Sequence, residues 1–364
     1  MEVNKLINKT FKGKKVFLTG NTGFKGSWLN LWLENTGADV KGYSLKPEAV
    51  SLFGSIQKKL NSETVYSDIR DKEKLQSEVL KFKPDFIFHL AAKSLVRYSY
   101  KHPLETFETN INGTANLLKS ISKLNNECTV VIITTDKVYL NKEWIYPYRE
   151  NDELGGYDPY SASKASAEIV TASMRNSFFN IKDIKVHRKA ISTARAGNVI
   201  GGGDYSADRI IPDIVKALKK NKPVEIRNPY SVRPWQYVLE PLYGYLLLAA
   251  KMKQDPEKYS GAYNFGPYLD DNLTVEELVR SAIKSWGKGN YKLNIDRKAP
   301  HEAGLLRLDI SKAILELNWK PVMKSSEAIE KTIGWYRSSF KEPENNFKLT
   351  TDHLNEYIKR TEDN

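Results

Sequence analysis

Apolar runs and amphipathic stretches alternate along the first half of the chain. The apolar runs have the length of buried strands and fall at residues 15–19, 39–44, 65–68, 86–92 and 129–134. Helical patterns follow several of them, among others at residues 27–36 and 109–124. Strands that alternate with helices are typical of a parallel sheet with helices on both faces. The pattern therefore predicts a doubly wound α/β domain that binds its ligands at the carboxyl ends of its strands.

The second half has shorter elements, and its loops are rich in glycine, proline and arginine. Helical patterns cover residues 210–220, 241–252 and 274–286. We expect residues 1–194 to form the sheet domain. Residues 195–340 would form mainly a smaller α/β lobe, with some of the chain crossing back to the first domain. The charged residues 341–364 predict a peripheral C-terminal helix.

A glycine-rich loop joins the first predicted strand to the helix that follows it. Its glycines have the spacing Gly20-x-x-Gly23-x-x-Gly26, which differs from the general G-x-G-x-x-G fingerprint. Glycines let the backbone approach a pyrophosphate closely, and a helix N-terminus offers free N–H groups and the positive end of its dipole. A strand, a glycine loop and a helix in this order predict a dinucleotide-binding site.

The end of the second predicted strand bears on the choice between NAD and NADP. An NAD site often carries an Asp or Glu there to bind the ribose 2′-hydroxyl. This chain instead has Ser44, which can bond the ribose, and Lys46, which favours a 2′-phosphate. We expect NAD, and NADP stays open.

Two further strand ends contribute to the expected cofactor site. Asp68 either accepts a hydrogen bond from the adenine amino group or caps the helix that begins near Asp71. Small residues after the fourth strand would let a dinucleotide lie across the edge of the sheet. The residues expected to contact the cofactor are Gly20, Thr22, Gly23, Phe24, Gly26, Ser44, Asp68, Ile69, Leu90, Ala91, Ala92, Tyr160 and Lys164.

The candidate chemistry is concentrated between residues 134 and 164. Tyr160 and Lys164 stand four residues apart and so share one face of a helix, with Asp158 as its expected N-cap and Pro159 at its first position. A phenol has a pKa of about 10 and is a poor base at neutral pH, but a neighbouring cation favours the phenolate. The spacing predicts that Tyr160 accepts a proton. A Tyr and a Lys at this spacing also arise by chance, and the neighbouring motifs decide the matter.

Four motifs in order resemble those of the extended short-chain dehydrogenase/reductase family. They are Gly20-x-x-Gly23-x-x-Gly26, His89-Leu-Ala-Ala92, Thr134-Thr-Asp-Lys137 and Tyr160-x-x-x-Lys164. More narrowly, the chain resembles the nucleotide-sugar 4,6-dehydratases, and most closely those of CDP-glucose. The stretches that carry this narrower resemblance are Gly23-Phe-Lys-Gly-Ser-Trp28, Leu95-Val-Arg97, Gly155-Gly-Tyr-Asp-Pro-Tyr160, residues 195–204, residues 227–235 and Pro300-His-Glu-Ala303.

The resemblance implies a Rossmann-type sheet and a hydro-lyase reaction that converts a nucleotide-activated hexose to a 4-keto-6-deoxy sugar. It implies a tightly bound NAD that takes hydride from C4 and returns it to C6. Tyr160, with Lys164 beside it, would take the proton of the 4-hydroxyl, and Thr135 would bond the 4-oxygen. Asp136 is our choice for the acid of the elimination and Lys137 for its base, with positioning of the sugar as the alternative role of Lys137. The positions implied for substrate binding are Asn198, Arg209, Arg233, His301 and Arg307.

Other functions stay open as hypotheses. A nucleotide-sugar C4-epimerase needs the Tyr and Lys pair but no elimination pair, and it ranks second. A 4,6-dehydratase of another nucleotide sugar is a further alternative, although many hexose 4,6-dehydratases carry Asp-Glu where this chain has Asp136 and Lys137. A non-catalytic dinucleotide-binding regulator is disfavoured by the intact Tyr160, Lys164 and Asp136.

Composition narrows the class of protein. The 364 residues include 56 Lys and Arg against 44 Asp and Glu, which gives a formal net charge of +12. These basic residues are scattered, so we expect an anionic small substrate and no nucleic acid. No apolar run reaches membrane-spanning length, and no His or Cys spacing suits a metal. The single cysteine, Cys128, fits a reducing compartment. We expect a cytoplasmic protein without a metal or a membrane anchor, and the resemblance implies a homodimer formed by residues 109–124 and 160–179.

Overall fold

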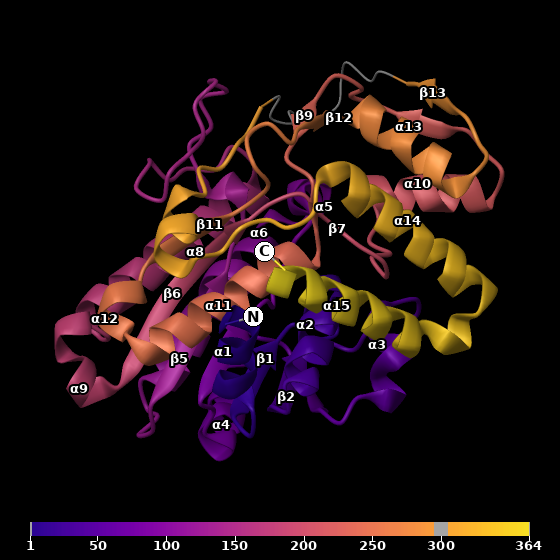
Figure 1. The fold of residues 1–364 in the computed structure, drawn as a ribbon. Coiled ribbons are helices and arrows are strands. Elements are labelled where there is room, and N and C mark those ends of the chain that lie inside the picture. Colours follow the sequence, from indigo (N-terminus) through magenta and orange to yellow (C-terminus); the bar gives the residue numbers. More distant parts are fainter. Residues whose placement is uncertain (1, 295–304, 364) are drawn as a thin grey trace.

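A parallel sheet is the centre of the protein, with the strand order β11-β6-β5-β4-β1-β2-β3 (Figure 1). The computed structural model describes residues 2–294 and 305–363. The strands of this sheet are β1 Lys15–Thr19, β2 Asp39–Ser44, β3 Glu63–Tyr66, β4 Phe86–His89, β5 Cys128–Ile133, β6 Lys189–Ala196 and β11 Ala262–Phe265. The predicted doubly wound sheet of the Rossmann type is confirmed.

Alternate residues of the strands face two separate apolar layers. Val16 and Leu18 of β1 pack in one buried cluster, whereas Phe17 between them packs in the other. Neighbouring residues of β5 divide in the same way, with Val131 in the first cluster and Val130 in the second. Side chains of a strand alternate between its faces, so both faces of this sheet are buried and need a cover of helices.

Helices cover both faces of the sheet. The first cluster includes residues of α1 Glu2–Phe11, α2 Phe24–Asn35, α11 Leu239–Gln254, α14 Ser325–Lys341 and α15 Asn346–Asp363. The second includes residues of α4 Lys72–Phe82, α7 Gly113–Ile121 and α8 Pro159–Ser177. Short helices in the connections are α3 Leu52–Ile56, α5 Val96–Lys101, α6 Pro103–Phe107, α9 Ile184–His187 and α12 Pro256–Tyr259.

A smaller lobe is built from the second half of the chain and lies at the upper right of Figure 1. Its elements are α10 Ile210–Lys219, β8 Val224–Ile226, β9 Val232–Arg233, β12 Leu273–Thr274, α13 Val275–Trp286 and β13 Tyr291–Leu293. β8 pairs with β13 in parallel, and β9 pairs with β12 in the antiparallel sense. A further parallel pair joins β7 Val199–Ile200 to β10 Gln236–Tyr237. Strand β11 returns from this half to pair with β6 in the main sheet.

Two helices beside the expected cofactor site differ from the sequence prediction. α2 begins at Phe24, so Phe24 lies in its first turn rather than in the glycine loop. The single helix predicted for residues 109–124 is divided, because α6 continues through a π-helical turn, Glu108–Asn112, before α7 begins. At the start of α7, Gly113 packs so closely on Ile69 that a Cβ would lie 2.7 Å from Ile69 Cγ2. Tertiary packing of this kind is not encoded in the local pattern.

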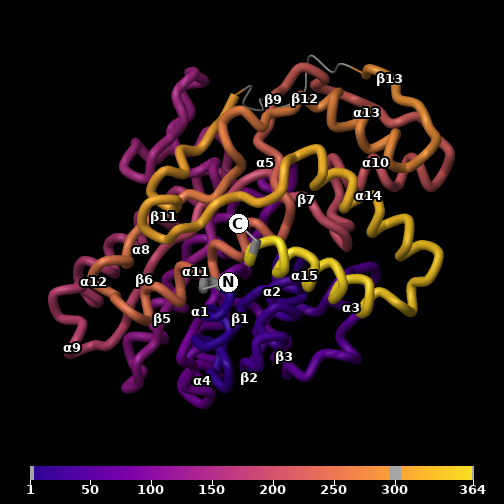
Figure 2. The backbone as a smooth tube through the Cα atoms, in the orientation of Figure 1, coloured from indigo at the N-terminus to yellow at the C-terminus, as the bar shows by residue number. Residues whose placement is uncertain are grey.

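The first and last helices lie against each other. Asn4 Nδ2 donates a hydrogen bond to Thr361 Oγ1 at 2.7 Å, and the two ends of the chain come close together in Figures 1 and 2. Leu354 and Tyr357 of α15 are fully buried, and Tyr357 meets Trp32 edge-on with 5.9 Å between ring centres. One face of the predicted C-terminal helix is thus part of the main core.

Candidate active site

The carboxyl ends of β1, β4 and β5 lie side by side at one edge of the sheet. Thr19 at the end of β1 is in register with His89 of β4, which is in register with Ile132 of β5. The glycine loop, the pair of alanines after β4 and the Thr134–Thr135 pair follow these strand ends directly. The parallel sheet therefore brings together the motifs that the sequence analysis placed at strand ends.

The glycine loop makes backbone contacts that a side chain would block. Gly20 has a φ of 76°, and a Cβ on it would lie 2.7 Å from the backbone nitrogen of Ala91. A Cβ on Gly26 would lie 2.0 Å from the carbonyl oxygen of Gly20. Gly23 is the N-cap of α2 and has no side chain to cover the first N–H groups of that helix. This cradle fits the diphosphate of a dinucleotide.

Thr22 and Ser44 connect the glycine loop to the end of β2. Their hydroxyl groups share a hydrogen bond of 2.7 Å, and Thr22 also donates to the carbonyl of Leu45 at 3.0 Å. Ser44 is buried. A ribose at this strand end would share the Ser44 hydroxyl with Thr22.

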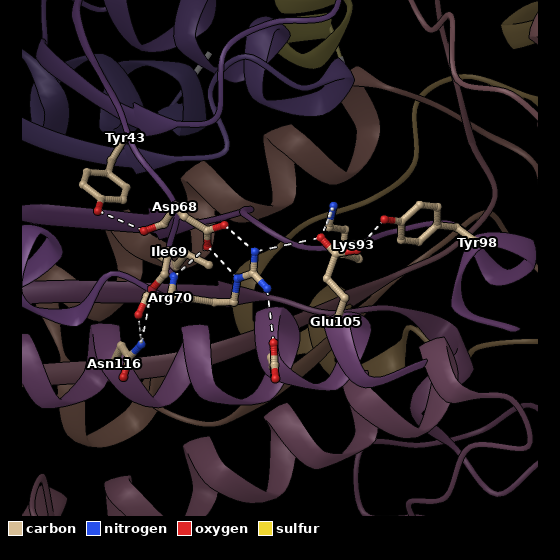
Figure 3. A network of polar contacts seen from close by, with 9 residues as sticks. Tyr43, Asp68, Ile69, Arg70, Lys93, Tyr98, Glu105 and Asn116 are labelled. Carbon is tan, nitrogen blue, oxygen red and sulfur yellow. Dashed lines mark hydrogen bonds and ion pairs between the residues drawn. The ribbon is translucent and has the colours of Figure 1, made fainter. Parts of the chain in front are cut away.

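A network of charged side chains occupies the carboxyl ends of β3 and β4 (Figure 3). Asp68, which lies beyond the end of β3, is bound by the backbone N–H of Arg70 at 2.8 Å and by its guanidinium at 3.0 and 2.8 Å. Arg70 also contacts Glu108 at 3.2 Å, and Lys93 contacts Glu105 at 3.0 Å. The hydrogen bonds and the charge of Arg70 hold the pKa of Asp68 below its usual range.

Asp71 is the N-cap of α4, because its side chain accepts from the backbone N–H of Lys74 at 3.0 Å. The capping role that the sequence left open for Asp68 is therefore wrong. Ile69, between the two acids, is buried. Of the two expected roles of Asp68, only adenine binding stays as a prediction.

Thr135, Asp136 and Lys137 follow β5. The Thr135 hydroxyl donates to Asp136 Oδ1 at 2.8 Å, and Asn198 Nδ2 approaches Asp136 Oδ2 at 3.4 Å. Asp136 is fully buried, and a Cβ on Gly197 would lie 2.0 Å from Asp136 Oδ2. The Lys137 side chain is 31% exposed, with its Nζ 3.9 Å from Asp136 Oδ1. The carboxylate is fixed on several sides, while the ammonium beside it is only partly enclosed.

Helix α8 presents Tyr160 and Lys164 as the spacing predicts. Pro159 is its first residue, and Asp158 caps it by accepting from the backbone N–H of Ser161 at 3.0 Å. Both Tyr160 and Lys164 are buried. The predicted N-cap and first residue of this helix are confirmed.

The electrostatics of Tyr160 differ from the expectation. Burial raises the pKa of Tyr160 to about 12, and a hydrogen bond with Thr135 and the charge of Arg209 offset this only in part. Lys164 donates from Nζ to the carbonyl of Ile133 at 3.0 Å, and burial lowers its own pKa to about 8. In the protein alone, desolvation outweighs the nearby charges, and the expectation that Lys164 favours the phenolate stays a prediction.

Glu168 of α8, four residues after Lys164, contacts Arg195 of β6, and the sequence analysis missed both. Glu168 accepts hydrogen bonds from Thr134 at 2.5 Å, Thr193 at 2.7 Å and Arg195 at 2.9 Å. These four side chains are buried. The spacing of four residues between Lys164 and Glu168 is the signal that would have identified the acid. The network ties the ends of β5 and β6 to α8.

Arg209 lies near the catalytic residues, since its charge acts on Tyr160. Its guanidinium donates to Asp204 at 2.9 Å and to the Ser94 hydroxyl at 3.0 Å. Lys25 of α2 is a second cation whose charge is coupled to this site, and the sequence analysis did not single it out. Both cations come from segments far from α8 in sequence, so no local pattern connects them to Tyr160.

Arg307 and Asp136 line one pocket, which joins the second half of the chain to the catalytic residues. Its lining residues are Asp136, Gly197, Pro234, Gln236, Gly266, Pro267, Tyr268, Leu269, Asn272, Arg307 and Leu308. Arg307 Nε is buried without a hydrogen-bond partner among residues 2–294 and 305–363. Arg233 ends β9 opposite Leu273 of β12. His301 lies outside the described residues.

Cys128 is buried at the start of β5, and burial raises the pKa of its thiol to about 12. In the part of the chain that the structure describes, no group of three or more His, Cys, Asp or Glu side chains is arranged to hold a metal ion. Among the same residues, no helix is both long and apolar enough to cross a membrane.

Comparisons with known proteins agree with this geometry. The CDP-glucose 4,6-dehydratase of Salmonella typhimurium is 48% identical over 335 residues, which cover 92% of this chain and 93% of that protein. The dTDP-glucose 4,6-dehydratase of the same organism is 25% identical, over 88% of this chain and 92% of its own. The solved dTDP-glucose 4,6-dehydratase of Bacillus anthracis, in complex with NAD, has a TM-score of 0.75 at 21% identity and covers 91% of this chain and 100% of its own.

A second solved structure has the same fold. The UDP-glucose 4-epimerase of Thermotoga maritima, with UDP-glucose, has a TM-score of 0.76 at 21% identity, over 90% of this chain and 99% of its own. Residues 17–332 match the family described as GDP-mannose 4,6 dehydratase. The resemblance to nucleotide-sugar dehydratases noted in the sequence is confirmed, and the chain belongs to the GDP-mannose 4,6-dehydratase family.

Proposed function

We propose that the protein is an NAD-dependent CDP-glucose 4,6-dehydratase, a hydro-lyase that forms CDP-4-keto-6-deoxy-D-glucose and water from CDP-D-glucose. The observation that carries the proposal is that Thr135 donates to Asp136 and interacts with Tyr160, with Lys137 next to the acid. Oxidation at C4 and elimination across C5 and C6 need two such sets of groups within reach of one sugar. The 48% identity to the Salmonella CDP-glucose 4,6-dehydratase, over 92% of this chain, supports the choice of substrate.

The glycine loop and the strand ends beside it would hold NAD. The open N-terminus of α2 suits the diphosphate, while Ser44 and Asp68 offer hydrogen-bond acceptors at the ends of β2 and β3. When bound, NAD would supply a hydride acceptor for C4 and a hydride donor for C6, so that none is consumed. The NAD held by the related dehydratase of Bacillus anthracis supports NAD over NADP.

Tyr160 would take the proton of the sugar 4-hydroxyl. A pKa of about 12 makes the neutral phenol its resting form, so its oxygen becomes a base only as positive charge gathers around it. Arg209 supplies part of that charge. Thr135, which interacts with Tyr160, would hold the 4-oxygen in line for proton transfer.

Asp136 and Lys137 would carry the elimination. A ketone at C4 acidifies the hydrogen on C5, and Lys137 would remove it as a proton. The C5–C6 double bond forms as the bond from C6 to oxygen breaks, and a proton from Asp136 lets the oxygen leave as water. When hydride is returned to C6, C5 needs a proton, which Lys137 would give back. The fixed, buried Asp136 and the partly exposed Lys137 suit a proton donor held in place and a base that reaches the sugar.

Basic side chains of the second half would bind the nucleotide diphosphate. Arg307 Nε, which has no partner among the described residues, would be satisfied by an anionic oxygen in the pocket that it shares with Asp136. Asn198 lies next to Asp136 and would contact the sugar. Arg209, Arg233 and His301 complete the substrate residues that we propose.

A homodimer, a cytoplasmic location and a role in deoxysugar synthesis for surface polysaccharides such as O-antigen belong to the same proposal. Support for the dimer comes from α8, where Ile169 is 57% exposed and Phe178, at its C-terminal end, is 59% exposed. Apolar side chains on a helix surface are suited to pack against a second copy. Light scattering at micromolar concentration should give twice the mass of the chain, and a monomer mass would refute the dimer.

Turnover of different nucleotide sugars tests the function. The protein is incubated separately with CDP-glucose, dTDP-glucose and UDP-glucose, and the products are identified by NMR. We expect a 4-keto-6-deoxy sugar from CDP-glucose. A sugar inverted at C4 that retains its 6-hydroxyl would identify a C4-epimerase, and dehydration of another nucleotide sugar alone would overturn the assignment of the base.

A further inference from the structure

Lys25 holds a positive charge between the glycine loop and the catalytic residues. It lies in the first turn of α2, and its Nζ is 3.5 Å from the hydroxyl of Tyr245 on α11 and 5.7 Å from the centre of that ring. Tyr245 is fully buried and packs edge-on against Phe265, with 5.7 Å between ring centres. The ammonium thus lies over an aromatic ring in a half-buried position.

The charges that surround Lys25 are those of the candidate active site. Lys164 of α8 and Arg209 before α10 repel its ammonium, and Asp136 after β5 attracts it. Burial and an electrostatic interaction with Tyr160 raise the pKa of Tyr245, which places these two residues near each other. Burial and the two cations lower the pKa of Lys25 to about 7, against the effect of Asp136.

The described residues include no carboxylate within 4.0 Å of the Lys25 ammonium. Even a partly buried cation without an ion-pair partner has a desolvation cost. A hydrophobic side chain at this position would avoid that cost and still pack on Tyr245. The position of the charge is therefore the property that requires an explanation.

We propose that Lys25 is an electrostatic residue of the cofactor site, whose positive charge raises the affinity for reduced dinucleotide relative to oxidised dinucleotide. The inference rests on the proposed function, in which NAD would accept hydride from C4 while Tyr160 takes the proton of the 4-hydroxyl. The nicotinamide ring would then lie near Tyr160. An oxidised nicotinamide ring carries a positive charge, which the reduced ring lacks. A nearby ammonium repels the oxidised ring and leaves the reduced ring unaffected. Its charge therefore favours the direction in which C4 of the sugar is oxidised.

The alternative role of Lys25 is structural, as a tie between α2 and α11 through Tyr245. The two roles differ in their effect on the two forms of the cofactor. Loss of a structural tie would weaken NAD and NADH binding equally. Loss of a charge would improve NAD binding relative to NADH binding.

Dissociation constants of NAD and NADH, measured by titration calorimetry without any sugar at about pH 6, distinguish these roles because Lys25 is protonated there. For Lys25→Met, we expect the ratio of the NAD constant to the NADH constant to fall roughly tenfold from that of the parent. Lys25→Arg keeps the charge, and Tyr245→Phe keeps both the charge and the ring. Both should hold the ratio within about twofold of the parent, as matched controls.

An unchanged ratio in a Lys25→Met variant with the parent's melting temperature would overturn the inference, as would an equal loss of affinity for both forms. Lys25→Gln provides a second neutral variant if the methionine variant does not fold. The assay needs no substrate. If the ratio of the two dissociation constants falls as expected in Lys25→Met but the parent does not turn over CDP-glucose, only the assigned substrate is overturned. A parent that binds neither dinucleotide would overturn both this inference and the assigned cofactor.

Discussion

Arg195 at the end of β6 forms a 2.9 Å ion pair with Glu168 of α8, and each side chain is only 4% exposed. Burial by itself would raise the pKa of Glu168, but Arg195 and the hydroxyls of Thr134 and Thr193 outweigh it and lower that pKa. A buried pair contributes little beyond what packed apolar residues would give, but breaking it on one side leaves an uncompensated charge.

Replacement of Arg195 should therefore strongly destabilise the folded protein. We expect Arg195→Met to lower the free energy of unfolding by about 3–5 kcal/mol, because Glu168 would stay buried without its partner. Urea unfolding followed by circular dichroism measures this loss. The double variant Glu168→Gln/Arg195→Met should recover much of it. A free energy of unfolding of Arg195→Met within about 1 kcal/mol of the parent's would show that the pair is solvated or dispensable.

Tyr160→Phe should nearly abolish turnover while nucleotide-sugar binding survives. The ring remains in its buried place on a helix capped by Asp158, but the oxygen that accepts the proton is gone. Loss of a general base typically costs a factor of about 100 to 10,000 in rate. Stopped assays of product and calorimetry of CDP-glucose binding give the two quantities. Activity within a few-fold of the parent would remove Tyr160 from the mechanism.

Lys137→Met separates a C5 base from a residue that positions the sugar. If Lys137 is the base, oxidation at C4 still occurs and elimination stops, so the absorbance of reduced cofactor should build up after CDP-glucose is added. The hydrogen at C5 should then fail to exchange with solvent deuterium. If Lys137 only positions the sugar, both steps slow together and no absorbance accumulates. Exchange at the parent's rate would exclude Lys137 as the base.

Gly197→Ala tests whether the position of Asp136 matters. The added Cβ would lie 2.0 Å from Asp136 Oδ2, so the carboxylate must move. We expect turnover to fall at least about tenfold, with NAD binding unchanged, because a small misplacement of an acid is costly. Gly334→Ala in α14 is the matched control, since its Cβ would meet no described atom within 4 Å. It should keep full activity and add about 0.5–1 kcal/mol of stability. Equal activity of the two variants would contradict the role of Asp136.

The lowered pKa of Lys164 predicts how the free energy of unfolding depends on pH. Its pKa is about 8 in the folded protein, below its usual value of 10.5, so the folded state binds fewer protons than the unfolded state between these limits. Stability due to this group therefore rises as pH increases through that window, and the cost of the buried charge is present in full below it. The parent should gain about 2–3 kcal/mol relative to Lys164→Met over this range. A pH-independent difference in urea unfolding between the two would refute the lowered pKa.

Local patterns were sufficient for β1 to β5 and for the start of α8. β1 is a continuous apolar run because both of its faces are buried, and a run of this length is visible in the sequence. Asp158 and Pro159 act within one turn of their own helix, so their roles follow from position alone. The expected roles of Gly20 and Gly26 in the loop follow from the order of strand, loop and helix.

Contacts between distant segments could not be predicted in this way. Glu168 of α8 contacts Arg195 of β6, and Lys25 of α2 contacts Tyr245 of α11, although nothing in either local pattern selects the partner. The raised pKa of Tyr160 has the same origin. Lys164 is visible in the sequence, but the desolvation that outweighs its charge depends on the packing of the whole domain.

The cations of the candidate site have a kinetic consequence. Lys137 lies 3.9 Å from Asp136, the charge of Lys25 is coupled to those of Lys164, Arg209 and Asp136, and the chain as a whole has an excess of basic residues. A charged nucleotide sugar that diffuses toward this edge of the sheet is attracted before any contact forms. Its capture should thus be fast in dilute buffer and slow as salt is added, whereas escape of a bound molecule should respond far less to ionic strength.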